Sequence, residues 1–127
     1  MLAGIGVDIV EIERIRRMIH RYGDRVAKRL LTEQEFSRYC CRHQSASFLA
    51  TRFAAKEAAS KALGTGIANG IGFHDIEVTN DDDGKPDLLF HGEAMSLLKR
   101  HNIRHWMLSL SDEKNYAVAM VVLEGDA

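Results

Sequence analysis

Apolar residues recur along the chain at two different spacings, which indicates a mixture of strands and helices. Residues 2–7 form a short apolar run, which predicts a buried strand. Asp8 follows at the start of a helical pattern whose apolar positions are Ile12, Ile15, Ile19 and Tyr22. An aspartate at that place is typical of a helix N-cap, an interaction of about 1 kcal/mol. Gly23 predicts the end of this first helix.

A second helix is predicted to begin at Thr32. Thr32 and Glu35 have the spacing of a capping box, in which each side chain accepts a hydrogen bond from the other residue's backbone N–H. Leu31 and Phe36 are placed to form the hydrophobic staple that often accompanies this motif. Capping alone accounts for Glu35, so no functional role is predicted for it.

Residues 47–63 predict a long helix packed closely against a sheet, since its narrow apolar stripe is Phe48, Leu49, Phe53, Ala54, Ala58 and Ala62. Gly64 is expected at the C′ position. The remaining elements are a hairpin with strands at 74–79 and 88–90, a short helix at 93–100, and strands at 106–110 and 116–123 joined by a polar turn at 111–115. Together these elements predict an α+β fold with an antiparallel sheet.

Length and composition narrow the class of protein. With 127 residues, 46% of them hydrophobic, and a single proline, the chain predicts one domain over residues 1–127. The adjacent Cys40 and Cys41 cannot easily form a disulfide with each other, so a reducing compartment is expected. No apolar run approaches the roughly 20 residues of a membrane span. We therefore expect a cytoplasmic protein with no membrane partner.

Basic residues cluster near the N-terminus although the net charge is only −1. Residues 14–29 contain only one acidic residue, Asp24, and seven basic ones: Arg14, Arg16, Arg17, Arg21, Arg25, Lys28 and Arg29. If the first helix persists, four side chains share an arc of roughly 60°: Arg14, Met18, Arg21 and Arg25. The pattern fits a solvated basic face or a surface that docks an acidic helix. Near-neutral net charge favours one acidic partner over general nucleic-acid binding.

The segment around Glu57 has the layout of a metal and phosphate site. Glu57 and Lys61 lie four residues apart and so share one helical face, although an ordinary surface ion pair explains the same spacing. Mg²⁺ needs only one or two protein carboxylates, which Asp8 and Glu57 could supply. The backbone N–H groups of residues 64–66 could donate to phosphate oxygens. The six histidines show no zinc-ligand spacing.

These residues also resemble a known family. Residues 4–15 (GIGVDIVEIERI) and 53–66 (FAAKEAASKALGTG) are similar to the two signature motifs of the holo-acyl-carrier-protein synthases, the small 4′-phosphopantetheinyl transferases. The likeness extends to residues 83–86 (DGKP) and to the closing segment 109–119. It implies the fold of that family, with an antiparallel sheet packed around a long central helix.

The resemblance implies a Mg²⁺-dependent enzyme that transfers 4′-phosphopantetheine from coenzyme A to a serine of apo acyl carrier protein. Adenosine 3′,5′-bisphosphate would be released, and the activity would support fatty acid biosynthesis. The implied magnesium ligands are Asp8 and Glu57, and the implied catalytic residues are Glu57 and Lys61. The implied coenzyme A contacts are Arg52, Lys61, Gly64, Thr65, Lys85, Pro86 and Ser109. The implied carrier-protein contacts are Arg14, Met18, Arg21 and Arg25.

Family members also form homotrimers with coenzyme A held between subunits, so a trimer with shared active sites is expected. Two positions depart from the family pattern: Met107 and Asp112 stand where many members have histidine. Those histidines cannot provide the base that takes the serine proton. A water held by Mg²⁺ and oriented by Glu57 is the hypothesis for that base.

Two other classes of function remain open on the residues themselves. One is a binding module without catalysis that uses the arginine-rich helix to bind RNA or an acidic protein. The other is a different Mg²⁺-dependent nucleotide enzyme, such as a small phosphohydrolase. Indifference to coenzyme A would favour the first, and nucleotide turnover without modification of a carrier protein would favour the second.

Overall fold

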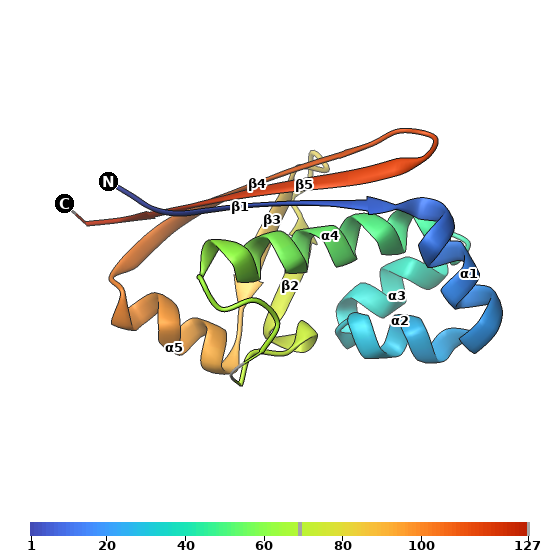
Figure 1. Ribbon diagram of the computed structural model, residues 1–127, viewed down its shortest axis with the longest axis horizontal. Coiled ribbons are helices and arrows are strands. Elements are labelled where there is room, and N and C mark those ends of the chain that lie inside the picture. The colour runs from blue at the N-terminus through green and yellow to red at the C-terminus, as the bar shows by residue number, and fades with distance from the viewer. Residues whose placement is uncertain (69, 127) are drawn as a thin grey trace.

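The computed structural model describes residues 1–68 and 70–126 and has the predicted α+β composition (Figure 1). Its elements are β1 (Leu2–Glu11), α1 (Ile12–Tyr22), α2 (Asp24–Leu30), α3 (Glu33–Cys41), α4 (Ala46–Ala62), the short 3₁₀ helix η1 (Phe73–Asp75), β2 (Ile76–Asn80), β3 (Pro86–Phe90), α5 (Gly92–Arg100), β4 (Ile103–Asp112) and β5 (Tyr116–Gly125). The strands form two antiparallel sheets, ordered β1-β5-β4 and β2-β3. The predicted single sheet is therefore two, since β2 and β3 pair only with each other.

Helix α4 is the central element of the molecule. In Figure 1 it lies along the three-stranded sheet, with α1, α2 and α3 gathered near its beginning and α5 near its end. Ser45 caps its N-terminus by accepting a hydrogen bond from the Phe48 N–H at 3.3 Å. Gly64 follows its C-terminus with a φ of 84°, which confirms the predicted C′ glycine. The long predicted helix is therefore present, beginning one residue earlier than expected.

Strand β1 approaches α4 so closely that only glycine fits at two positions. A Cβ at Gly6 would lie 1.9 Å from the carbonyl oxygen of Ala58, and one at Gly4 would lie 2.2 Å from that of Ala62. The alanines on the helix complete this contact, and the sheet-facing side of α4 is buried. Gly4 and Gly6 share one face of β1 with Asp8, because side chains alternate along a strand. The glycines thus bring the Asp8 side of β1 against α4.

The predicted N-cap role of Asp8 is wrong. Strand β1 continues to Glu11, and Asp8 lies inside it, opposite Ala119 of β5. Glu11 occupies the N-cap position of α1 and makes no side-chain capping bond. Pairing with β5 along the whole of β1 has overridden the local capping signal. The strand is also buried on one face only, because Ile5, Val7 and other side chains on its opposite face are exposed.

Between α1 and β2 the predicted helix caps are confirmed, but the structure also contains two short helices that were not predicted. Gly23 ends α1 as predicted, but a separate helix, α2, starts at the next residue. The capping box of α3 is confirmed: Thr32 Oγ1 accepts from the Glu35 N–H at 3.3 Å, and Glu35 Oε1 accepts from the Thr32 N–H at 2.9 Å. Strand β2 begins at Ile76, not at the predicted residue 74, since η1 occupies residues 73–75.

The turn between β4 and β5 spans residues 113–115, so it is shorter than the predicted 111–115. Pairing of Asp112 with Ala117 extends the β4–β5 ladder into the polar segment. Among the described residues, no helix is both long and apolar enough to cross a membrane.

Candidate active site

Asp8 and Lys61 meet at the seam between β1 and α4. Lys61 Nζ lies 3.0 Å from Asp8 Oδ1 and also donates to the Val7 carbonyl at 3.1 Å. The Asp8 side chain is 16% exposed and that of Lys61 is 51% exposed, so the carboxylate is largely buried and the ammonium is open to solvent. The alternative of a surface ion pair between Glu57 and Lys61 is not observed, because Lys61 pairs with Asp8 across two elements. Strand β1 and helix α4 together build this part of the site.

Glu57 lies one helical turn before Lys61, and the charges of Asp8, Lys61 and Arg14 all affect it. Partial burial raises the pKa of Glu57 above its ordinary value, and the negative charge of Asp8 raises it further. The cations of Lys61 and Arg14 lower this pKa and offset part of the shift. Two carboxylates and two cations therefore lie close enough to influence one another. The pKa shift of Glu57 therefore has several causes, whereas a surface Glu–Lys pair would involve the lysine alone.

Gly64 and Thr65 form the turn that leaves α4 beside Lys61. The N–H of Gly64 donates to the Lys61 carbonyl at 2.9 Å, and that of Thr65 donates to the Ser60 carbonyl at 3.1 Å. These two N–H groups are therefore used within the turn. The Thr65 hydroxyl donates to the Gly66 carbonyl at 2.8 Å. Contacts from this turn to a phosphate would come from the Thr65 hydroxyl, which would turn its O–H from the Gly66 carbonyl to a phosphate oxygen, or from a rearranged turn.

Arg52 lies on α4 away from Lys61 and faces a different cavity. Its guanidinium lies 3.8 Å from the centre of the Phe48 ring and donates to Asn80 Oδ1 at 3.1 Å. Burial lowers the pKa of Arg52 to about 10, although the side chain remains a cation at neutral pH. The adjoining cavity has a volume of about 300 Å³ and is lined by Arg42, Ser45, Ser47, Phe48, Thr51, Arg52 and Asp112. It has the charge and hydrogen-bond donors to hold an anion.

Pro86 and Ser109 lie on strands β3 and β4, and Lys85 lies in the turn just before β3. Lys85 and Pro86 line a cavity of about 200 Å³ together with Trp106 and Met107. Ser109 is exposed on β4, opposite Met120 of β5. The chain therefore divides the predicted coenzyme A contacts into separate groups, with only Lys61, Gly64 and Thr65 next to the Asp8–Glu57 pair.

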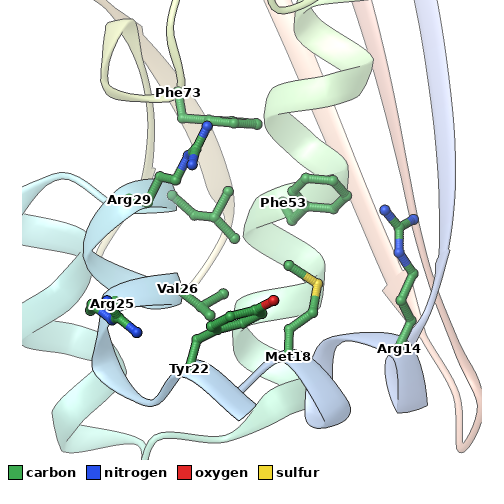
Figure 2. Close-up of a pocket in the computed structure, with 9 residues that line it drawn as sticks. Arg14, Met18, Tyr22, Arg25, Val26, Arg29, Phe53 and Phe73 are labelled. Carbon is green, nitrogen blue, oxygen red and sulfur yellow. The ribbon is translucent and has the colours of Figure 1, made fainter. Parts of the chain in front are cut away.

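The predicted carrier-protein contacts lie around a cavity of about 540 Å³ between α1, α2 and α4 (Figure 2). We call it the arginine cavity; it is lined by Arg14, Met18, Tyr22, Arg25, Val26, Arg29, Leu30, Phe53 and Phe73. Figure 2 shows Met18 and Phe53 pointing toward each other across it. Arg25 joins Arg14 and Met18 although Gly23 ends α1, because α2 leaves Gly23 in a new direction and lines the same cavity (Figure 1). Arg21 does not line the cavity and lies 5.3 Å from the Tyr22 ring centre.

Sequence reasoning missed three contributors to these cavities. Phe73 lines the arginine cavity from η1, and Arg29 lines it from α2, which was not predicted as a helix. Ser47 Oγ donates to Asp112 Oδ2 at 2.9 Å beside Arg52. Arg29 belongs to the basic cluster of residues 14–29, so its charge could have indicated that it contributes to this cavity. Nothing in the sequence pattern separated Phe73 or Ser47 from structural residues.

The described residues contain no group of three or more His, Cys, Asp or Glu side chains that could hold a metal ion. Asp8 and Glu57 supply two carboxylates from neighbouring elements, which is a ligand set suited to Mg²⁺ with substrate phosphates and waters completing its shell. Met107 is exposed on β4, and Asp112 accepts the bond from Ser47.

Comparison with known proteins agrees with this geometry. A family model described as the 4′-phosphopantetheinyl transferase superfamily matches residues 4–121. A curated holo-acyl-carrier-protein synthase of Aliivibrio salmonicida is 51% identical over 123 residues, which cover 97% of this chain and 98% of that relative.

Solved structures agree over the same length. A holo-acyl-carrier-protein synthase from Neisseria meningitidis superposes with a TM-score of 0.90 at 41% identity, covering 98% of this chain and 99% of that one. A Bacillus anthracis structure described as a complex with CoA (3′,5′-ADP) has a TM-score of 0.79 at 44% identity, with 99% of both chains covered. The match spans both elements that build the Asp8–Lys61 contact and the helices around the arginine cavity. The chain belongs to the 4′-phosphopantetheinyl transferase superfamily.

Proposed function

We propose that this protein transfers the 4′-phosphopantetheine group of coenzyme A to a serine of apo acyl carrier protein, and that residues 1–127 form one such transferase domain. The observation that carries the proposal is the meeting of Asp8, Glu57 and Lys61 at the β1–α4 seam, beside the turn at Gly64. Carrier modification of this kind supplies fatty acid biosynthesis, which we propose as the cellular role, in the cytoplasm.

The residues at the seam fit a magnesium ion. Asp8 and Glu57 are hard oxygen donors, and the charge of Asp8 raises the pKa of Glu57, so a cation between them would relieve their repulsion. When bound, Mg²⁺ would stabilise the negative charge of the pyrophosphate. Lys61 would share that task by releasing Asp8 Oδ1 and pairing with a phosphate oxygen as a point charge.

The transfer is a substitution at phosphorus. The serine oxygen of the carrier forms a bond to the phosphorus that bears pantetheine, and the bond from that phosphorus to the bridging oxygen breaks. The serine proton would pass to a water oriented by Glu57, and adenosine 3′,5′-bisphosphate leaves with the electron pair of the broken bond. Because phosphoryl-type transfer depends mainly on positioning and charge stabilisation, a protein can catalyse it without a covalent intermediate. Lys61 would hold the reacting phosphates directly, Asp8 and Glu57 would hold the cation that neutralises them, and the arginine cavity would hold the carrier.

We propose a homotrimer in which neighbouring subunits complete each site. Lys85 and Pro86 line a cavity that does not include Asp8, and Ser109 lies on the outer face of the sheet, so these residues would serve the site of a neighbour. The outer face of the three-stranded sheet supports an interface, because it exposes a row of apolar residues on β1: Ile5 at 66%, Val7 at 52% and Ile9 at 62%. Met107 and Met120 continue this face across β4 and β5, with Ser109 opposite Met120. Contiguous exposed apolar surface usually marks an interaction site.

The arginine cavity is the proposed docking site for the carrier protein. Arg14 and Arg25 supply positive charge around an apolar floor that includes Met18 and Phe53. This combination suits an acidic helix with one or two apolar side chains, since charge steers the encounter and a flexible methionine adapts to the insert. Arg14 lines the cavity and also lowers the pKa of Glu57, which supports a carrier site close to the proposed metal pair. Arg21 is kept as a peripheral contact in this proposal.

The test is the intact mass of an apo acyl carrier protein after incubation with this protein, coenzyme A and Mg²⁺. Transfer adds one phosphopantetheine, about 340 Da, to a serine, and EDTA should abolish the gain. Glu57→Gln and Asp8→Asn should each remove most turnover while leaving the circular dichroism spectrum unchanged. Glu33→Gln, an exposed glutamate of α3, is the matched control and should retain turnover. Unmodified carrier, with an authentic transferase active in parallel, would refute the proposal.

A further inference from the structure

Strand β2 pairs with β3 along one edge, and charged side chains bond to its other edge. Lys56 Nζ donates to the Ile76 carbonyl at 2.6 Å. The Val78 N–H donates to Glu35 Oε2 at 2.8 Å, and Arg38 donates to the Val78 carbonyl at 3.1 Å. Side chains from α3 and α4 thus take the place of a neighbouring strand. This arrangement joins the hairpin to the two helices through directional bonds.

Lys56 is the centre of this network. Its side chain is fully buried, and its ammonium donates to three acceptors: Glu35 Oε1 at 2.6 Å, the Phe73 carbonyl at 2.8 Å and the Ile76 carbonyl at 2.6 Å. An ammonium group has three donors, so all are used. Glu35 is equally buried and accepts from Lys56, Thr32 and Val78. Its role therefore exceeds the helix capping that the sequence predicted.

On the opposite side, α4 bonds to the sheet near its two ends, through Ser47 to Asp112 and through Lys61 to Val7 and Asp8. Toward the sheet α4 presents small buried residues such as Ala54, Ala58 and Ala62. Alanine side chains allow close approach, but they are too short to interlock with β1 and β5. The glycine contact sets how near the helix lies. The bonds of Lys56 join the middle of α4 to α3, η1 and β2.

We infer that Lys56 is a positioning residue for the proposed metal pair: its buried bonds to Glu35, Phe73 and Ile76 hold the rotation of α4 that directs Glu57 toward Asp8. Glu57 is the next residue, about 100° around and about 1.5 Å along the helix, so rotation at Lys56 moves Glu57 by the same angle. The inference deepens the proposed function and rests on it, because it concerns the geometry of that same site. Lys56 itself touches no substrate in this role.

The test uses variants that remove the bonds without leaving a lone buried charge. Lys56→Met alone would leave Glu35 uncompensated and is expected to unfold the protein in part. The double variant Lys56→Met/Glu35→Gln removes both charges at similar volume and is the main probe. Lys56→Arg keeps a cation and several donors and serves as the conservative rescue. Lys99→Met, an exposed lysine of α5, is the control.

Two readouts separate positioning from stability. The first is the Mg²⁺ concentration that gives half-maximal transfer, measured on protein shown to be folded by its unfolding transition. The second is Mg²⁺ binding by calorimetry, which does not depend on turnover. We expect the double variant to need about tenfold more Mg²⁺ or higher, the range found when groups that orient metal ligands are lost. Lys56→Arg should recover part of this loss, and Lys99→Met should match the unmodified protein.

A double variant with unchanged Mg²⁺ dependence per folded molecule would overturn the inference, even if it melted at a lower temperature, because a purely structural role predicts that result. The proposed function fails separately: in that case the unmodified protein itself modifies no carrier. If the unmodified protein binds Mg²⁺ without transfer, calorimetry of the variants still decides whether Lys56 positions the pair.

Discussion

At the scale of single residues, the balance of charges around Glu57 determines when this side chain can hold a cation. Burial and Asp8 favour its protonated form, while Lys61 and Arg14 favour the carboxylate. The net result is a pKa above the ordinary 4.5, so protons compete with a cation at higher pH than they would at a solvent-exposed glutamate.

The sign of this shift gives a first prediction. Lowering the pH through the Glu57 pKa should weaken Mg²⁺ binding, by up to about tenfold for each pH unit below it. Arg14→Gln removes a cation that lowers this pKa, so the loss should begin at higher pH. Calorimetric titration of Mg²⁺ from pH 5 to 8 measures the effect. Arg16→Gln, in which the lost side chain pairs with Glu13, should keep the original profile. Identical profiles for both variants would contradict the role of Arg14.

At the scale of elements, the contact between β1 and α4 is set by backbone atoms. Gly6→Ala would place a methyl group 1.9 Å from the Ala58 carbonyl oxygen, and a backbone oxygen cannot move aside as a side chain can. We predict a loss of about 1–3 kcal/mol or more in the free energy of unfolding, measured by urea titration. Gly72→Ala is the control, because no atom lies within 4 Å of its added carbon. Equal stabilities of the two variants would show that the seam can open.

The pair α1 and α2 supports a third prediction. Arg14→Glu and Arg25→Glu reverse charges that line the arginine cavity, so each should raise the KM for acyl carrier protein on the order of tenfold and weaken its dependence on salt. Arg16→Glu changes the net charge equally but lies outside the lining, and it should have the smaller effect. Steady-state transfer at several ionic strengths measures both. If all three variants had the same KM for acyl carrier protein, the arginine cavity would act only as part of a general basic surface.

At the scale of the whole molecule, the outer face of the sheet predicts assembly. Val7→Asp places a charge in the middle of the exposed apolar row, so it should shift a trimer toward monomers in sedimentation and reduce transfer. Leu89→Asp changes a residue of similar exposure, 46%, on β3 and is the control. A trimer that survives Val7→Asp would mean that this face is not the interface.

Shared sites can be tested in the same assembly. A Glu57→Gln chain and a Lys85→Ala chain should each be impaired alone, since each lacks one contributor to every site. Mixed trimers would contain some sites with both residues intact if the two come from different subunits. Recovery of transfer on mixing, after subunit exchange, is the expected result. The absence of recovery in verified mixed trimers would place both residues in the same subunit's site.

The sequence predicted most of what depends on neighbouring residues in the chain. The capping box at Thr32 and the C′ glycine at Gly64 were correct, because their partners lie within four residues. Asp8 was assigned to a cap and lies in a strand, since pairing with β5 depends on residues more than 100 positions away. Lys56 gave no sign of burial, because its partners in α3, η1 and β2 meet only in the folded chain.

The proposed site also combines features that the sequence predicted with features that appear only in the folded chain. Resemblance to a family selected Asp8, Glu57 and Lys61, and the structure brings them together. Spacing alone left Glu57 and Lys61 as an ordinary surface pair. The separation of Lys85 from this cluster depends on the arrangement of the two sheets, and Ser109 lies in the same sheet as Asp8 but on its outer face. The hydrophobic pattern of one chain also does not predict how copies of the chain assemble.

The side chains that close the edge of β2 also affect how the chain can reach its folded state. An unpaired strand edge is a template for pairing with other chains, and Lys56, Glu35 and Arg38 cover this one only after α3 and α4 have formed. Both helices precede β2 in the sequence, so during synthesis the covering groups emerge before the edge does. A full-length chain diluted from denaturant lacks that order. Aggregation during refolding should therefore rise with protein concentration more steeply than during synthesis on the ribosome.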